Sequence, residues 1–266
     1  MNIGFGVGLT QRGNFRYLPS SVLDVLVKYG TDAHMWVPGV GMVDGIMARN
    51  WQDGAGTVAA VVGQPVGKVD DVGGGSVALM RDADAVRPTL ALDGKSNYNW
   101  AMNGSFHKLP LTAPVFQLTD NFCVVAGVSL TSANVANAIF AQSNANNNAL
   151  PEMMFDSTGR LGVYTLGGGA TLNAFGGPSN TGVGPIVATM VNNAGTIRVR
   201  RDGVQITSLT LSGVYATATT AAVGAFPTLN ATEFLPGAMY SVVAIKGTVS
   251  DADLLTVENF VAANAK

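Results

Sequence analysis

Residues 186–206 read IVATMVNNAGTIRVRRDGVQI, and they carry the strongest signal of fold class in the chain. Apolar and charged side chains alternate over 197–200, which is typical of a strand with one buried face. Asp202-Gly203 then lies between two alternating segments, as in the tight turn of a β-hairpin. Another turn, at 192–195, separates this hairpin from the apolar run 186–191. The stretch therefore predicts antiparallel strands that follow one another along the chain.

Short apolar runs and turns alternate elsewhere in the same way. Residues 156–159 (DSTG) form a turn signal between the runs 153–155 and 161–164, so we expect three or four antiparallel strands in series. Turns about 8–12 residues apart favour a β-sandwich, and 266 residues is an ordinary size for one domain of that class. Further strands are expected at 123–130, 138–142 and 239–246.

The N-terminal residues differ from this pattern, and we treat 1–30 as an arm with a short helix and 31–266 as the sandwich domain. Residues 19–29 have helical periodicity, with Ser20 or Ser21 as the N-cap. The residues before this helix carry spaced aromatic side chains without periodicity, which cannot bury themselves. The arm therefore either packs on its own sandwich or binds a neighbouring subunit. The candidate anchoring residues are Phe5, Leu9, Phe15 and Tyr17.

A second helix is expected at the C-terminus, where residues 250–266 read SDADLLTVENFVAANAK. Ser250 and Asp253 have the spacing of a capping box. The helix should cover the outside of the sandwich, with its apolar face packed against the sheet. That face consists of Leu254, Val257 and Val261.

Charged residues are scarce: they make up 12% of the chain, about half the usual share, and the net charge is −2. Residues 1–120 carry 19 of them, residues 121–245 carry eight, and residues 161–197 carry none. Such a chain lacks the basic surface that binds a phosphate backbone or an anionic membrane. Its apolar runs are also too short to cross a bilayer. We therefore expect neither nucleic-acid binding nor membrane insertion.

Few residues could support catalysis, and we expect a protein that is not an enzyme. His34 and His107 lie in turn-like contexts, and neither has a nucleophile motif nearby. Cys123 is the single cysteine and lies in an apolar run, which indicates a buried strand residue. Because a metal site needs three or four convergent donors, we expect no metal and no cofactor.

Glycoside hydrolysis requires two carboxyl groups about 5–10 Å apart across the scissile bond. The glutamates are Glu152, Glu233 and Glu258, and none of them has another acid at strand spacing on a clear strand. Two acids that are adjacent in the sequence would face opposite sides of a strand, so they could not act as such a pair. The sequence therefore argues against a glycosidase.

Sugar binding without catalysis needs an aromatic platform and a few amide or hydroxyl partners. Asn97, Tyr98 and Trp100 supply both kinds of group within a short segment, and we take them as candidate carbohydrate-binding residues. On a strand, Tyr98 and Trp100 would share one face. The alternative is that this face is the buried one, so that both rings belong to the core.

Two series of short segments indicate a particular family of proteins. The first series is WQDGAGT at 51–57, QPVGKVDD at 64–71 and RPTLALDG at 87–94. The second is RDG at 201–203, LPGAMYS at 235–241 and the helix start SDAD at 250–253. In their order and spacing, over about Val40 to Lys266, these segments resemble bacteriophage virion proteins that carry a concanavalin A-like (laminin-G-like) domain.

The resemblance implies an all-β, two-sheet antiparallel jelly-roll sandwich, in agreement with the strand pattern. It implies a non-enzymatic component of a virion, such as a tail fibre, a tail appendage or a capsid decoration protein, made in the host bacterial cytoplasm. The implied partners are capsid or tail subunits and other copies of the chain. A receptor-recognition module would also bind a host surface glycan. Residues 1–39 fall outside the resemblance, as an attachment arm particular to one particle would.

Overall fold

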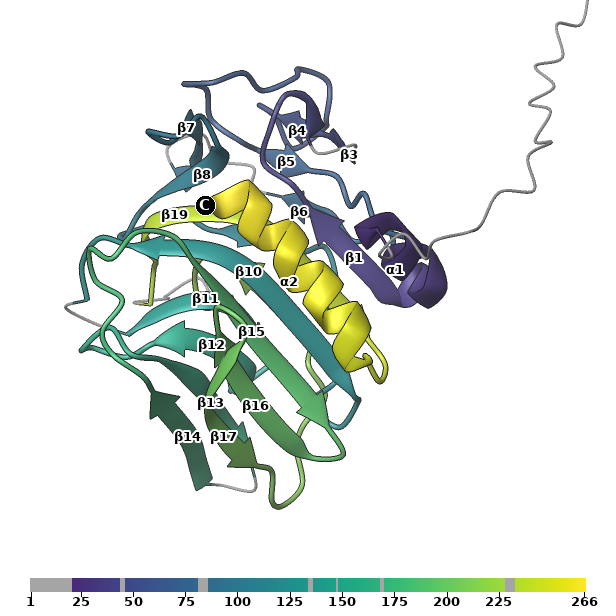
Figure 1. Cartoon of the computed structure of the whole chain (residues 1–266), viewed down its shortest axis with the longest axis vertical. Helices are drawn as coiled ribbons and strands as arrows, with labels where there is room; N and C mark the ends of the chain where they lie inside the picture. Colours follow the sequence, from purple (N-terminus) through teal and green to yellow (C-terminus); the bar gives the residue numbers. More distant parts are fainter. Residues whose placement is uncertain are drawn as a thin grey trace, which may run out of the picture.

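Two antiparallel sheets pack face to face in the computed structural model, which describes residues 21–43, 46–80, 86–133, 136–146, 148–167, 170–227 and 233–266 (Figure 1). The larger sheet has eight strands in the order β17-β16-β15-β10-β19-β8-β7, with β1 also paired to β19. Its strands are β1 Ala33–Trp36, β7 Thr89–Leu92, β8 Tyr98–Asn103, β10 Phe122–Leu130, β15 Ile186–Asn193, β16 Thr196–Arg201, β17 Val204–Thr210 and β19 Pro236–Lys246.

The smaller sheet has six strands in the order β14-β13-β12-β11-β18-β9. Its strands are β9 Leu109–Pro110, β11 Asn137–Ser143, β12 Ala149–Phe155, β13 Leu161–Gly167, β14 Ala170–Gly176 and β18 Thr220–Val223. Short strands near the N-terminal end form two further small sheets. These strands are β2 Gly41–Val43, β3 Ile46–Ala48, β4 Asn50–Trp51, β5 Lys68–Val69 and β6 Leu79–Met80. The predicted concanavalin A-like jelly-roll sandwich is confirmed.

The hairpin predicted at Asp202-Gly203 joins β16 to β17. Asp202 and Gly203 have φ angles of 51° and 80°, and a type I′ turn needs such left-handed conformations at both central positions. The Asp202 carboxylate also accepts a hydrogen bond from the backbone N–H of Val187 at 2.8 Å, which ties the turn to β15. The further strands that we predicted are present as β10, β11 and β19.

A continuous hydrophobic core fills the space between the sheets. Phe116, in the connection between β9 and β10, stacks on Phe122 with ring centroids 3.9 Å apart and lies 5.8 Å from the ring of Phe140. Because Phe122 belongs to the larger sheet and Phe140 to the smaller one, this ring joins both. The largest fully buried side chains of the core include Trp36, Trp100, Phe122, Phe140 and Phe155.

Helix α2, Asp251–Ala265, covers the outer face of the larger sheet over β10, β15 and β19, as predicted (Figure 1). The approach is close at Gly127, where a Cβ would lie 2.8 Å from the Cβ of Tyr240 and 3.0 Å from that of Ala265. Cys123 is buried beneath the helix, and this burial raises the pKa of its thiol to about 12. Leu254, Val257 and Val261, which form the predicted apolar face, are all buried.

Helix α1, Val22–Tyr29, confirms the short N-terminal helix and packs against α2. Ser21 is its N-cap, and the Ser21 hydroxyl accepts from the backbone N–H of Asp24 while the Asp24 carboxylate accepts from the backbone N–H of Ser21. In the last turn, Lys28 Nζ lies 2.6 Å from an Asp253 carboxylate oxygen at the start of α2. The helix is therefore part of the folded domain.

Candidate functional site

Trp100, proposed as a sugar platform, lies in the core with no exposed surface. Its indole N–H donates a hydrogen bond to Asn50 Oδ1 at 2.8 Å. The Asn50 amide in turn donates to the carbonyls of Val37 and Gly39 at 2.8 and 3.2 Å. A sugar cannot reach the Trp100 ring. The ring belongs to the core, which was the alternative interpretation of this residue.

Asn97 and Tyr98 also serve the fold. The backbone N–H of Asn97 donates to Asp93 Oδ1 at 2.9 Å, and its side-chain amide lies 3.4 Å from the other carboxylate oxygen. The Asp93 carboxylate also accepts from the hydroxyl of Tyr240 at 3.1 Å, which fixes the β7-β8 turn to β19. Tyr98 is partly buried against the main core. The three candidate residues therefore form no open platform.

Two carboxyl groups meet on the outward side of the smaller sheet. On β12, Met153 and Phe155 belong to the core, so Glu152 faces the opposite way. Glu152 is nevertheless only 1% exposed. Its carboxyl group is electrostatically coupled to that of Glu233, which lies on the segment that leads into β19. The backbone carbonyl of Glu233 accepts from the N–H of Ala138 at 3.1 Å, which fixes this segment to β11.

The carboxyl pair retains a proton under conditions where ordinary glutamates are ionised. Burial raises the pKa of Glu152 well above its usual value, and the neighbouring Glu233 raises it further. Burial also raises the pKa of Glu233. The two carboxyl groups therefore titrate together rather than independently.

His34 is buried, in contrast to the turn position expected from the sequence. Its Nδ1 lies 2.7 Å from Asp71 Oδ2, and its ring stacks on Trp36. The other oxygen of Asp71 accepts from the backbone N–H groups of Met35 and Gly73, each at 2.9 Å. The His34–Asp71 pair thus fixes the loop after β5 to strand β1.

The glycine run 73–75 is explained by the same packing. A Cβ at Gly74 would lie 2.0 Å from the carbonyl oxygen of Gly30, and a Cβ at Gly75 would lie 2.1 Å from the His34 ring. Neither distance is tolerated between non-bonded atoms, so the loop requires residues without side chains. The close contacts with Gly30 and His34 are the physical reason for these glycines.

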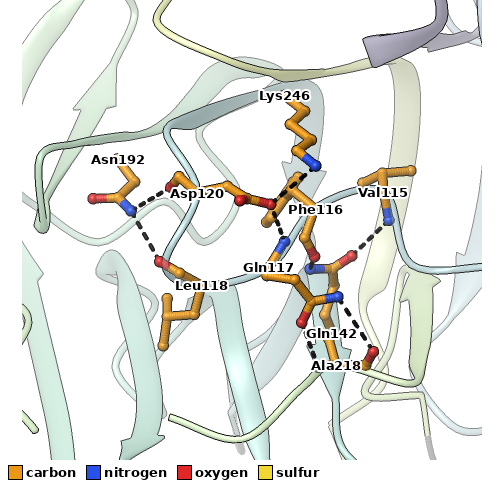
Figure 2. A network of polar contacts seen from close by, with 9 residues as sticks. All are labelled: Val115, Phe116, Gln117, Leu118, Asp120, Gln142, Asn192, Ala218 and Lys246. Carbon is orange, nitrogen blue, oxygen red and sulfur yellow. Dashed lines mark hydrogen bonds and ion pairs between the residues drawn. The ribbon is translucent and has the colours of Figure 1, made fainter. Parts of the chain in front are cut away.

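A buried polar network at one end of the sandwich holds the segment 115–120 (Figure 2). Gln142, on β11, accepts from a backbone N–H of this segment at 2.9 Å and donates to a carbonyl at 2.8 Å. Asn192, on β15, donates to two of its carbonyls at 3.0 and 2.7 Å. Asp120 forms an ion pair with Lys246 at 3.5 Å. These amides attach one connection to both sheets.

A groove lies beside the β2-β3 hairpin and consists of two adjoining hollows of about 410 and 330 Å³, of which the larger is mainly apolar and the smaller mixed. Met47 and Arg49 line both of them. The larger hollow is also lined by Val40, Asn50, Trp51, Ala59 and Ala60. The smaller one is also lined by Leu23, Ile46, Asp71 and Gly73. We call the two together the hairpin groove.

Exposed apolar side chains surround the hairpin groove. Met42 pairs with Met47 across the β2-β3 hairpin, and Val58, Val61 and Val62 flank the lining residues of the larger hollow. Each of these side chains is between 45% and 61% exposed. Single exposed apolar residues are ordinary, but a cluster of them around a groove is typical of an interaction surface. Sequence patterns missed this surface because its members lie on short strands and loops without periodicity.

The candidate anchoring residues Phe5, Leu9, Phe15 and Tyr17 lie outside the described residues. Within the described residues, no group of three or more histidine, cysteine, aspartate or glutamate side chains could hold a metal ion. The helices of the described part are too short or too polar to cross a membrane.

Comparison with known proteins identifies the fold alone. No protein-family model matches the chain, and no curated protein is significantly similar to it. Among solved structures, it is similar to the Trypanosoma rangeli sialidase in complex with 2,3-difluoro-KDN, at 10% identity and a TM-score of 0.58 over 91% of this chain and 38% of the sialidase. The covalent intermediate of that sialidase with 2,3-difluorosialic acid gives 10% identity and a TM-score of 0.57 over 91% and 39%.

A smaller similarity is found to the CBM40 of the Ruminococcus gnavus IT-sialidase bound to α2,3 sialyllactose. It has 12% identity and a TM-score of 0.46 over 53% of this chain and 83% of the CBM40, a score too low to support a conclusion. The chain spans less than half the length of the Trypanosoma sialidase. The sialidase similarities therefore support the lectin-like jelly-roll fold and transfer no activity to this chain.

Proposed function

We propose that the chain is a non-enzymatic structural component of a bacteriophage virion, a tail appendage or a capsid decoration protein. Its partners would be other virion proteins and copies of itself. The observation that carries this proposal is the hairpin groove, an exposed apolar surface that begins at Leu23, next to the point where the N-terminal arm joins the domain. An interaction surface at that position suits a protein that is attached to the particle through its arm and displays its jelly roll.

The ionisable groups of the described residues support a structural role. Glu152 and Glu233 interact with each other, and the His34–Asp71 pair lies under the glycine loop. On α2, Glu258 accepts from the Thr189 hydroxyl at 2.8 Å and from Arg200 at 3.1 Å. Each of these groups interacts with a group on another segment of the fold. The resemblance to phage virion proteins and the uncharged strand region agree with the same role.

The anchoring role is tested by deleting residues 2–18. The truncated chain retains Ser21 and should fold, because the helix cap and everything after it are intact. In cells infected by the phage that encodes the chain, the full-length protein should be found in purified particles and the truncated one should not. Incorporation of a folded truncated chain at the full-length level would overturn the proposal.

A matched pair of variants separates apolar anchoring from arm length. Alanine at all four of Phe5, Leu9, Phe15 and Tyr17 should prevent incorporation into particles. Alanine at the same number of polar arm residues, Asn2, Thr10, Gln11 and Asn14, should leave incorporation unchanged. Equal effects of the two sets would contradict apolar anchoring.

Glycan recognition is a second proposal, favoured by one feature of the smaller sheet. Tyr164 on β13 pairs with Asn173 on β14, and both face away from the core, into which Val163 points. Tyr164 is half-buried and Asn173 is exposed, so an aromatic ring and an amide lie side by side on the outward face. These are the kinds of group that a sugar needs.

A glycan array tests this second proposal. The wild-type protein should bind a subset of bacterial surface glycans, and Tyr164→Ala should weaken that binding at least about tenfold, or about 1.4 kcal/mol. Trp100→Phe is the control, because Trp100 is buried and should not contact the sugar. No binding by the wild type, or equal binding by Tyr164→Ala, would remove this site.

A further inference from the structure

Exposed apolar side chains extend beyond both hollows of the hairpin groove. Leu23 lines the smaller hollow and is 44% exposed, and Val27, one turn further along the same face of α1, is 80% exposed. Three valines next to lining residues of the larger hollow are 45% to 50% exposed, namely Val58, Val61 and Val62. A small molecule seated in one hollow would leave most of these side chains in water. A segment of a protein could cover both hollows and the side chains around them.

A charged side chain lies where the two hollows meet. Arg49 lines both of them and is exposed. Within the described part of the chain, its guanidinium group forms no hydrogen bond and no ion pair. By contrast, Arg160 and Arg200 each pair with an acidic side chain of the protein itself, at 2.7 and 3.1 Å. The donors of Arg49 are therefore available to a partner, and a carboxylate is the group that fits a guanidinium with two parallel hydrogen bonds.

The acidic side chains around the groove already have partners. Asp71 lines the smaller hollow, but its side chain is only 2% exposed. One of its carboxylate oxygens lies 2.7 Å from His34 Nδ1, and the other accepts from two backbone N–H groups. Asp70 accepts a hydrogen bond from the indole N–H of Trp51 at 2.9 Å and pairs with Lys68 at 3.0 Å. The described residues of the groove therefore present a positive charge to a partner.

The charge of the groove distinguishes between possible occupants. Residues 1–20 carry Arg12 and Arg16 and no acidic side chain, so the N-terminal arm of this or another copy would bring like charges toward Arg49. We propose that the hairpin groove binds an acidic, apolar peptide segment of a partner protein, with a carboxylate on Arg49 and large apolar side chains in the two hollows. This inference rests on the proposed function, in which the partner is another virion protein, and it names the chemistry of that partner.

The arrangement of the hollows predicts a sequence pattern in the bound segment. Residues two positions apart in an extended peptide point to the same side. An acidic residue with a large apolar residue two positions before it and another two positions after it therefore presents all three side chains to the groove. This order matches Arg49 at the junction, with one hollow on either side of it.

Selection from random peptides displayed on yeast tests the inference, with the purified full-length protein as the bait. The wild type should enrich peptides in which an aspartate or glutamate has large apolar residues on both sides. Arg49→Glu protein should instead enrich lysine or arginine at that position, because the charge of the groove is reversed. Arg49 is exposed, so the variant should fold like the wild type, and thermal unfolding verifies this.

The affinity of one enriched peptide, made synthetically, is then measured by titration. Arg49→Gln should bind this peptide at least about tenfold more weakly than the wild type, because it loses a charge-assisted pair. Arg198→Gln is the matched control and should bind like the wild type, since Arg198 lies on β16 and does not line the groove. Added salt should weaken binding to the wild type and leave binding to Arg49→Gln unchanged.

Three results would overturn the inference: a selection that enriches no peptide, enriched peptides without an acidic residue, or equal binding by the wild type and Arg49→Gln. Enrichment of peptides that resemble residues 1–20 would also overturn it, because the occupant would then be the arm.

The proposed function and this inference can fail separately, because the selection uses purified protein and no particle. If acidic peptides bind through Arg49 but the chain is absent from the particle, the virion role falls and the chemistry of the groove stands. If the chain is on the particle but binding does not depend on Arg49, only this inference falls.

Discussion

Replacing Glu152 by glutamine should stabilise the protein at neutral and alkaline pH. In the folded chain, burial raises the pKa of Glu152 well above its ordinary value, so the folded state holds a proton that the unfolded chain releases above about pH 4.3. The stabilisation from this proton is therefore complete below that pH and is lost as the pH rises through the raised pKa. Each unit of pKa elevation costs about 1.4 kcal/mol at alkaline pH. Glu152→Gln removes the cost because the amide has a similar shape and stays neutral.

The assay is urea denaturation of wild type and Glu152→Gln from about pH 4 to about pH 9. The difference in the free energy of unfolding should be small at the acid end and widen as the pH rises. Each 1 kcal/mol gained should raise the melting temperature by about 2–4 °C. Glu233→Gln is the control, because Glu233 is more exposed and should give the same sign with a smaller size. A difference that does not change with pH would refute the interpretation that the carboxyl pair shares a proton.

Three substitutions test the packing of the fold by denaturation. Trp100→Ala should lower the free energy of unfolding by about 3–5 kcal/mol, because it leaves a cavity at a fully buried ring, and a loss below about 1 kcal/mol would contradict that burial. Arg200→Met should cost about 1–3 kcal/mol, because it removes the hydrogen bond to the buried Glu258, and adding Glu258→Gln should recover part of the loss. Without any recovery, the loss would not come from this ion pair. Gly75→Ala should cost about 1–3 kcal/mol, since its Cβ would collide with the imidazole beneath it. Gly94→Ala, with open space around it, should change stability by less than about 0.5 kcal/mol, and equal effects of the two would contradict the packing described.

The features that could be predicted are those with local causes. The Asp202-Gly203 turn needs left-handed conformations that its own residues adopt readily, and alternation on either side fixes which face is buried. The cap at Ser21 and the apolar face of α2 likewise depend on residues only a few positions apart. For this reason the hairpin, both helices and the main strands of the sandwich were correctly predicted.

The features that could not be predicted depend on contacts between distant segments. Glu152 and Glu233 are coupled only because the segment before β19, distant in the sequence, is hydrogen-bonded to β11 beside β12 in the folded chain. Likewise, Trp100 packs in the core, and its buried indole N–H is satisfied by Asn50, which is far away in the sequence. The strands around the hairpin groove span two or three residues each, which is too short for any period. Their pairing is set by the loops around them.

The proposed virion role is tested most directly by an electron-microscopy map of the phage particle that the proposal requires, at a resolution that traces side chains. The jelly roll should be found on the particle surface, with residues 1–20 in contact with another virion subunit. A particle in which this chain is absent would contradict the virion role itself.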